Sequence, residues 1–207
     1  MTDQAPLRRT PRQARSQKRV DAILQAAASL LNERGFEAMT TSAIAERAGV
    51  PVGTLYQFFP NRDAVLAGLA LQYLDDMEAD SAQLFTPDIV YVPLPVLMER
   101  TIDWIVAFGE THPGFFNVVG GAWVSPELHT ASDRFFSQLA GNIGRIITAH
   151  APQLAQERMQ VASLILMKLV GTVMPVIESA PAQARAQVIA DFKRICLLYL
   201  KSVCEEA

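Results

Sequence analysis

Residues 40–66, TTSAIAERAGVPVGTLYQFFPNRDAVL, bring small, polar and aromatic side chains close together in a chain of 207 residues. The apolar spacing predicts two short helices, over residues 42–48 and 52–58, and Gly49 ends the first of them. Two short helices joined by a tight turn allow one helix to brace a DNA backbone while the next enters the major groove. The block therefore predicts a contact with nucleic acid.

The two faces of the second predicted helix differ in chemistry. Leu55 and Phe58, with Phe59 directly after them, form an apolar side that requires burial. The other side carries small, polar or aromatic residues, namely Val52, Gly53, Thr54, Tyr56 and Gln57. That side is therefore available to DNA. The alternative, an ordinary hairpin in a helical bundle, leaves the polar first turn unexplained.

Charge is distributed unevenly along the chain. The formal net charge is −3, but residues 1–62 hold nine Lys and Arg against five Asp and Glu, which gives +4 there and −7 in the remainder. Six of these bases lie between Arg8 and Arg19, and a basic arm of this kind follows a polyanion. We expect the arm to be mobile in the free protein and ordered on DNA, and the alternative is a solvated tail.

Motifs of enzymes are missing from the sequence. It has no Gly-rich phosphate loop, no G-x-S-x-G and no H-E-x-x-H. His112, His129 and His150 have no second ligand at helical or turn spacing, so we expect neither a metal site nor a cofactor. Cys196 and Cys204 lie eight residues apart in a predicted helix, about 12 Å from each other, which is too far for a disulfide.

Helical periodicity extends over nearly the whole chain and predicts an all-α fold. We expect helices over residues 12–34, 62–84, 96–111, 114–120, 126–150, 153–179 and 182–204. Residues 86–95 hold three prolines and a β-branched patch and are interpreted as a linker, with an isolated strand as the alternative. We place a basic N-terminal domain in residues 1–62 and a helical domain in residues 63–207.

The longest apolar run, residues 161–177, contains Lys168 and Pro175 and is shorter than the roughly 20 residues of a membrane span. We interpret it as a bundle helix. The N-terminus lacks the pattern of a secretory leader, and unpaired thiols suit a reducing compartment. We therefore expect a cytoplasmic protein that is not attached to a membrane.

Two blocks resemble the DNA-binding segment of TetR-type transcriptional repressors. GTLYQFFPNRDAVL is similar to the family pattern G-T-L-Y-x-x-F-x-x-K-x-x-L, and residues 35–50 match G-F-x-x-x-T-T-x-x-I-A-x-x-A-G-V in order and spacing. The match covers about residues 17–70. The resemblance implies an all-helical homodimer with a three-helix helix-turn-helix domain and a C-terminal helical domain that binds an effector and dimerises.

The resemblance also implies roles for individual residues. In the family, the positions of Thr41 and Tyr56 contact phosphate, that of Thr54 faces the groove, and those of Ser42, Val52, Gly53 and Gln57 fall to base contacts. Arg62 stands where a phosphate-binding lysine is usual. Pro51 replaces a capping serine and Val52 offers no donor, so we expect a thymine-methyl contact and few hydrogen bonds to bases.

Aromatic and sulfur-containing side chains of the C-terminal domain are candidates for the lining of an apolar effector pocket. The candidates are Trp104, Phe108, Phe115, Phe116, Trp123, Phe136 and Met167, with Phe135, Met159 and Met174 as further members and Glu99, Asp103, His112 and His129 as polar anchors. Plain core packing is the alternative for each of them.

The last two predicted helices are too apolar to be covered on one side only, which predicts half of an intersubunit four-helix bundle. Its residues are Leu164, Ile165, Lys168, Leu169, Gly171, Thr172, Val176, Val188, Ile189, Phe192, Ile195, Cys196, Tyr199 and Leu200. We interpret the chain as a repressor that binds a palindromic operator as a homodimer and is released by an apolar or aromatic effector. The alternatives are a small-molecule binding or catalytic module with a vestigial DNA-binding hairpin, and a constitutive architectural DNA-binding protein.

Overall fold

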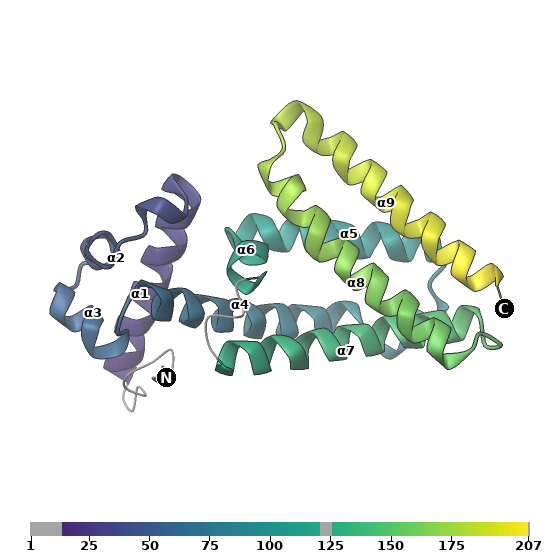
Figure 1. Ribbon diagram of the computed structural model, residues 1–207, viewed down its shortest axis with the longest axis horizontal. Coiled ribbons are helices and arrows are strands. Elements are labelled where there is room, and N and C mark those ends of the chain that lie inside the picture. The colour runs from purple at the N-terminus through teal and green to yellow at the C-terminus, as the bar shows by residue number, and fades with distance from the viewer. Residues whose placement is uncertain (1–13, 121–125, 207) are drawn as a thin grey trace. The chain divides into compact units, whose positions relative to one another are not determined.

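The computed structural model describes residues 14–120 and 126–206, and helices connected by short turns make up this part of the chain (Figure 1). The predicted all-α fold is confirmed. The chain forms two compact units, one of Met1–Asp76 with His112–Ser132 and one of Met77–Thr111 with Asp133–Ala207. The units therefore divide within helix α4, Arg62–Leu84, whereas the predicted domains meet at its first residue.

The described part of the first unit contains helix α1 (Ala14–Arg34), the 3₁₀ helix η1 (Phe36–Ala38), helices α2 (Thr41–Arg47) and α3 (Val52–Phe58), the start of α4, and helix α6 (Phe115–Gly120). Apolar residues spaced three and four apart along α1 form its buried stripe, namely Val20, Ile23, Leu24, Ala27, Leu30 and Leu31. This stripe packs against η1 and α2. The predicted core side of α1 is confirmed.

Part of the predicted mobile arm is helical instead. Helix α1 begins at Ala14, so Lys18 and Arg19 lie on it with exposed side chains. The Gln17 amide donates to the Asp21 carboxylate over 2.8 Å, an i, i+4 bond that supports the first turns of the helix. The expectation of a mobile arm up to Arg19 is therefore wrong for its second half, while residues 8–13 lie outside the described residues.

The turns of the helix–turn–helix segment have clear local causes. Gly49, between α2 and α3, has φ +66°, a left-handed conformation that glycine adopts without steric cost. The Thr40 hydroxyl accepts a hydrogen bond from Ala43 N over 3.1 Å and caps α2. The Asn61 side chain accepts from Ala64 N over 2.8 Å, which caps the start of α4 after the break at Pro60.

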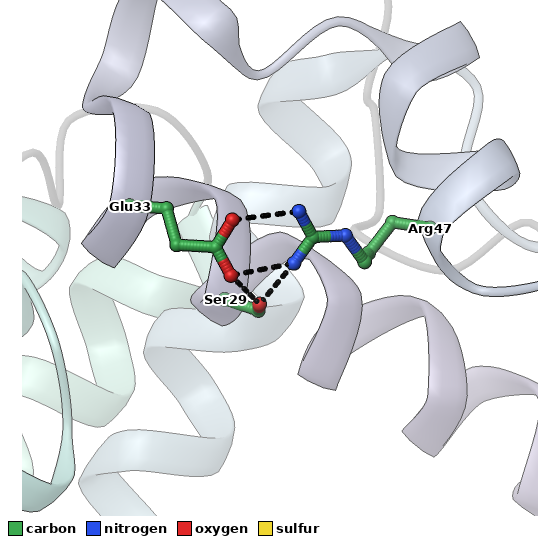
Figure 2. A network of polar contacts seen from close by, with 3 residues as sticks. All are labelled: Ser29, Glu33 and Arg47. Atoms are coloured by element: carbon green, nitrogen blue, oxygen red, sulfur yellow. Dashed lines mark hydrogen bonds and ion pairs between the residues drawn. The ribbon is translucent and has the colours of Figure 1, made fainter.

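A polar network joins α1 to α2 (Figure 2). The Arg47 guanidinium donates to both carboxylate oxygens of Glu33, each over 2.7 Å, and to the Ser29 hydroxyl over 2.6 Å. The Ser29 hydroxyl in turn donates to Glu33 over 3.0 Å. These hydrogen bonds, chiefly the one from Arg47, lower the pKa of the Glu33 carboxyl from 4.5 to about 2. The network therefore holds α2, the helix that precedes α3, against α1.

The second unit contains the end of α4, the 3₁₀ helix η2 (Pro87–Tyr91), helix α5 (Leu94–Thr111), most of α7 (Pro126–His150), α8 (Gln156–Ser179) and α9 (Ala182–Glu205). Phe85, Ile89, Leu97 and Ile146 form one of its core clusters. The segment interpreted as a linker is therefore a short helix. It contributes Ile89 to this core, because Ile89 packs with the buried residues of the same cluster.

Helices α8 and α9 run in opposite directions from their connection at residues 180–181, and α9 also packs against α5 (Figure 1). The Arg158 guanidinium near the start of α8 donates to both carboxylate oxygens of Glu206, each over 2.7 Å. Lys193 of α9 pairs with Asp103 and Glu99 of α5 over 2.7 and 3.2 Å. These ion pairs hold α9 to both of its neighbours.

The substitution Glu33→Gln tests the network between α1 and α2. Because the folded state lowers the pKa of Glu33 to about 2, the ionised carboxylate stabilises the fold above pH 4.5, and this contribution is lost as the pH falls from 4.5 towards 2. We expect the variant to have a lower melting temperature than the wild type at pH 7. The difference should shrink as the pH is lowered, and thermal melting followed by circular dichroism measures it. Glu37→Gln on η1 is the control, and its melting temperature should stay close to that of the wild type at each pH. A difference in melting temperature between Glu33→Gln and the wild type that persists unchanged to pH 2 would contradict this role of Glu33.

Candidate nucleic-acid interface and buried cavity

Helix α3 presents two chemically distinct sides, as predicted. Leu55, Phe58 and Phe59 are buried. Val52, Gly53, Tyr56 and Gln57 are exposed and Thr54 is half-buried. A Cβ added at Gly53 would meet no protein atom within 4 Å, so space is open in front of the first turn. Pro51 precedes the helix without a side-chain cap, which leaves this turn without a capping hydroxyl.

Two hydroxyl groups converge at the junction of α2 and α3. The Thr41 Oγ1 atom lies 3.1 Å from the Tyr56 hydroxyl oxygen, within hydrogen-bond distance. Either group can donate to the other, so one hydroxyl hydrogen remains for an external acceptor. Tyr56 is 40% exposed and Thr41 is half-buried, so both oxygens are held by the protein at its surface. Such a pair suits an anionic oxygen acceptor such as a phosphate.

Ser42 and Arg62, the remaining predicted DNA contacts, are both exposed. Ser42 lies in the first turn of α2 and Arg62 is the first residue of α4. The Arg62 guanidinium lies 3.5 Å from the carboxylate of Asp63, a weak surface ion pair that leaves donors for another anion. All eight predicted contact residues thus belong to the first unit, and each reaches its surface at least in part.

The second unit encloses an apolar cavity of about 60 Å³. Its lining comes from the residue directly after α4 and from α5, α7, α8 and α9, and consists of Phe85, Leu97, Met98, Thr101, Ile102, Trp104, Ile105, Leu139, Ile143, Ile146, Leu166, Met167, Val170, Cys196 and Leu200. No ionised side chain belongs to this lining. Burial raises the pKa of the Cys196 thiol to about 11, so it is neutral at pH 7.

Two of the predicted pocket residues, Trp104 and Met167, line this cavity. The others that the structure describes do not. Phe108 is buried with its ring 6.3 Å from that of Trp104, Phe136 has its ring 5.4 Å from that of Phe135, and Phe115 and Phe116 belong to the first unit. Met159 and Met174 are also outside the lining. Trp123 lies outside the described residues, and so does the side chain of His129.

The predicted polar anchors do not reach the cavity either. Glu99 and Asp103 pair with Lys193, and His112 belongs to the first unit, where its Nε2 lies 3.5 Å from Asp76. The prediction followed residue type and favoured large aromatic and charged side chains. The residues it missed are aliphatic ones, which recur three and four apart on the cavity-facing sides of α5, α7 and α8. That spacing is visible in the sequence, but it indicates any buried side of a helix and does not distinguish a cavity lining from a filled core.

Helices α8 and α9 each carry apolar side chains that the second unit leaves exposed, and we call these together the apolar surface of α8 and α9. On α8 it comprises Val161, Leu164, Ile165 and Val176, with Lys168, Gly171 and Thr172 between them, and on α9 it comprises Ile195 and Leu198. Phe192, Cys196 and Leu200, which were predicted for the same surface, are instead buried in the core of their own subunit. They lie on the core-facing side of α9, whereas Ile195 and Leu198 are exposed.

Helix α8 is the described helix whose length and apolar composition would suffice for a membrane span. Only 28% of its apolar window is buried inside the second unit. Composition alone does not separate a membrane helix from a helix with an apolar protein interface.

Curated relatives match this chain over segments of different length. The nucleoid occlusion factor SlmA of Pasteurella multocida is 25% identical over 141 residues, which cover 66% of each chain. The tetracycline repressor protein class C of Escherichia coli is 44% identical over 50 residues, 24% of this chain and 23% of the repressor. The chain thus spans less than two thirds of the length of these relatives in the matched segments.

Solved structures match over most of the chain. A TetR-family transcriptional regulator from Streptomyces coelicolor covers 89% of this chain with 99% of its own, at 22% identity and a TM-score of 0.57. A transcriptional regulator from Rhodococcus sp. Rha1 covers 91% with 97% of its own, at 12% identity and a TM-score of 0.65. At these identities the likeness shows a common fold.

Two family models match the chain in succession. Residues 23–69 match the model of bacterial regulatory proteins of the tetR family, and residues 93–200 match that of the tetracyclin repressor-like C-terminal domain. The second match alone extends over more than half of the 207 residues. The alternative of a catalytic module is therefore wrong. The chain belongs to the TetR family and is a DNA-binding transcriptional regulator, not an enzyme.

Proposed function

We propose that this regulator is a cytoplasmic, ligand-responsive repressor that binds a palindromic operator as a homodimer and is released by a small-molecule effector. The observation that carries the DNA-binding part is the pair of hydroxyls of Thr41 and Tyr56, 3.1 Å apart beside the exposed side of α3. The apolar surface of α8 and α9 supports the homodimer, and the cavity of the second unit supports the effector.

In this proposal Thr41, Tyr56 and Arg62 contact phosphates and position α3 in the major groove. Ser42, Val52, Gly53, Thr54 and Gln57 then face the bases. Val52 offers a methyl contact to thymine, Gln57 offers an amide, and Gly53 allows the backbone to approach closely because nothing occupies its Cβ position. Specificity therefore rests on shape and on methyl contacts more than on hydrogen bonds.

The homodimer places the apolar surface of α8 and α9 against the same surface of a second copy, which gives a four-helix bundle. Exposed Gly171 permits a close approach of the two helices, since a Cβ there would meet no atom of its own subunit. Lys168 keeps its ammonium group in water at the margin while its methylenes pack. Burial against protein also accounts for the apolar composition of α8 without a membrane.

Effector binding acts by a shift of population in this proposal. Helix α4 is shared by both compact units, with Arg62 at one end and cavity-lining Phe85 directly after the other. An effector that favours one arrangement of the second unit thereby moves α4 and changes the separation of the two copies of α3. Because tight binding needs both half-sites, a small change of separation releases the operator.

A double-mutant cycle of Thr41→Val and Tyr56→Phe tests the phosphate contact. Each substitution removes one hydroxyl, and we expect each to weaken binding by at least about tenfold, the usual effect of a hydrogen bond to a charged group. The losses should not add, because two oxygens 3.1 Å apart serve one acceptor. Fluorescence anisotropy with the DNA upstream of its own gene measures this; Tyr91→Phe, at an exposed tyrosine of η2, is the control. Full DNA affinity in the double variant would show that these two hydroxyls do not contact phosphate.

Arg62→Ala tests the charge at the start of α4. We expect weaker binding to operator and to random duplex in equal measure, and a salt slope lower in magnitude by about one for each subunit bound. Arg100→Ala, at an exposed arginine of α5, should leave the slope unchanged. If Arg62→Ala also leaves it unchanged, Arg62 does not contact DNA.

Ile195→Asp tests the homodimer. Ile195 is 52% exposed in the single chain, so a carboxylate there is tolerated by the subunit but becomes unpaired in an apolar interface, at a cost of several kcal/mol. In sedimentation velocity we expect twice the 22.7 kDa chain mass for the wild type and the single mass for the variant, with lower operator affinity. Val96→Asp, at a valine of α5 that is 48% exposed, should remain dimeric. A monomeric wild type that binds its operator tightly would refute the dimer.

A further inference from the structure

Helices α7 and α8 border an open groove on the second unit. The groove has a volume of about 600 Å³ and is lined by the second half of α7 and the first turns of α8. A Cβ added at Gly144 of α7 would approach the Met159 sulfur within 2.7 Å, so the two helices lie close together there. At Gly141, which also lines the groove, an added Cβ would meet no atom within 4 Å. The groove is therefore open at Gly141, because no side chain of its own subunit fills it.

The groove is continuous with the apolar surface of α8 and α9. Gln160 and Ser163 line the groove, and the residues that directly follow them, Val161 and Leu164, belong to that surface. Val161 and Leu164 are each 49% exposed in the single chain. A second copy that covers this side of α8 therefore also lies against the groove.

The charges of α8 favour the partner's α9 as the helix beside the groove. In a four-helix bundle each helix has two neighbours, and one neighbour of α8 is α9 of its own subunit. Lys168 lies near the middle of α8 and is its only charged residue between Arg158 and Glu178. A second α8 would bring two copies of Lys168 together, and like charges in an interface are unfavourable. A second α9 instead exposes Asp191 beside Arg194 and so offers an opposite charge.

The last two turns of α9 match the groove in shape and charge. Leu198, Ser202 and Glu205 are exposed and recur at spacings of four and three, so they lie on one side of α9. Arg145 is the one charged side chain among the described residues that line the groove. It is exposed and donates one hydrogen bond within its own helix, which leaves donors for a carboxylate. An apolar side chain and a carboxylate of α9 thus match the open space at Gly141 and the charge of Arg145.

The level of α9 along the bundle agrees with this match. Arg158 near the start of α8 pairs with Glu206, so the end of α9 is level with the start of α8 within one subunit. When the partner's α9 lies beside α8, the twofold axis runs along the bundle and keeps each helix at its level. The end of the partner's α9 is therefore level with Met159, Gln160 and Ser163, the groove residues of α8.

We propose that, in the homodimer, the groove between α7 and α8 of each copy receives the last two turns of α9 from the other copy. Leu198 enters the open space near Gly141, and Glu205 pairs with Arg145. This inference rests on the proposed homodimer and extends its interface from α8 and α9 to α7. Each dimer contains two such contacts, because the twofold axis repeats them.

Charge reversal of this pair tests the proposal. Arg145→Glu and Glu205→Arg each bring like charges together twice in a dimer, so we expect each variant to raise the dimer dissociation constant at least about tenfold in sedimentation equilibrium. In an equimolar mixture of the two variants, both contacts of the mixed dimer join opposite charges. The mixture should therefore associate within about threefold of the wild type. Arg100→Glu, at an exposed arginine of α5, is the matched control and should leave the constant unchanged.

The mixture separates a contact between copies from a contact within one copy. If Arg145 and Glu205 paired within one chain, the mixture would associate as weakly as the single variants, and this result would overturn the proposal. An unchanged dissociation constant in Arg145→Glu would overturn it too, and would leave the groove free for a different protein.

Gly141→Leu tests the shape of the groove. Leucine at this position has no atom of its own subunit against its Cβ and favours a helix more than glycine does, so the subunit should keep its helical circular-dichroism spectrum. The new side chain fills the space assigned to Leu198, and we expect the dimer dissociation constant to rise at least about tenfold. Ala79→Leu, at an exposed alanine of α4, is the control and should leave it unchanged. A wild-type constant in Gly141→Leu would show that α9 does not enter the groove.

The proposed homodimer and the groove contact can fail separately. A monomeric wild type would refute the homodimer and this inference with it. A dimeric wild type that Ile195→Asp dissociates, but that Arg145→Glu and Gly141→Leu leave intact, would refute the groove contact alone.

Discussion

The structure of the DNA-binding segment depends on the burial of one side of α3. A helix of seven residues is too short to be stable alone, so tertiary packing must hold it. Leu55 and Phe59 are fully buried, and the burial of each such side chain contributes about 1.5–3 kcal/mol. The Phe59 ring lies directly against Gly68 of α4, where an added Cβ would approach it within 2.9 Å. The opposite side of α3 is exposed because this packing turns it away from the core.

Polar contacts refine what burial establishes. The Arg47–Glu33 pair attaches α2 to α1, and the Thr41–Tyr56 contact joins α2 to α3. The three helices are thus connected by directional bonds at the surface as well as by their shared core. The second unit uses the reverse arrangement, with ion pairs such as Lys193–Asp103 outside and an apolar cavity inside. We infer that DNA is recognised at a polar surface and the effector in an apolar interior.

Local signals made much of the fold predictable from sequence. The bounds of α3 and α4 follow from Pro51, Pro60 and the Asn61 cap, which act on adjacent residues, and both helices were predicted over their full observed length. The 3₁₀ helix at Pro87–Tyr91 was missed, because it is supported by packing that composition does not reveal. The cavity was least predictable. Five separate segments of the chain meet there, and the cavity exists only once they are packed together.

We propose that two copies of α3 contact one operator at the same time. Selection of duplexes from a random-sequence pool by the full-length chain, followed by sequencing of the bound fraction, tests this claim most directly. We expect enrichment of an inverted repeat whose half-sites are centred about one helical turn, or 10–10.5 base pairs, apart. Enrichment of a single unrepeated site, or of no sequence at all, would contradict it.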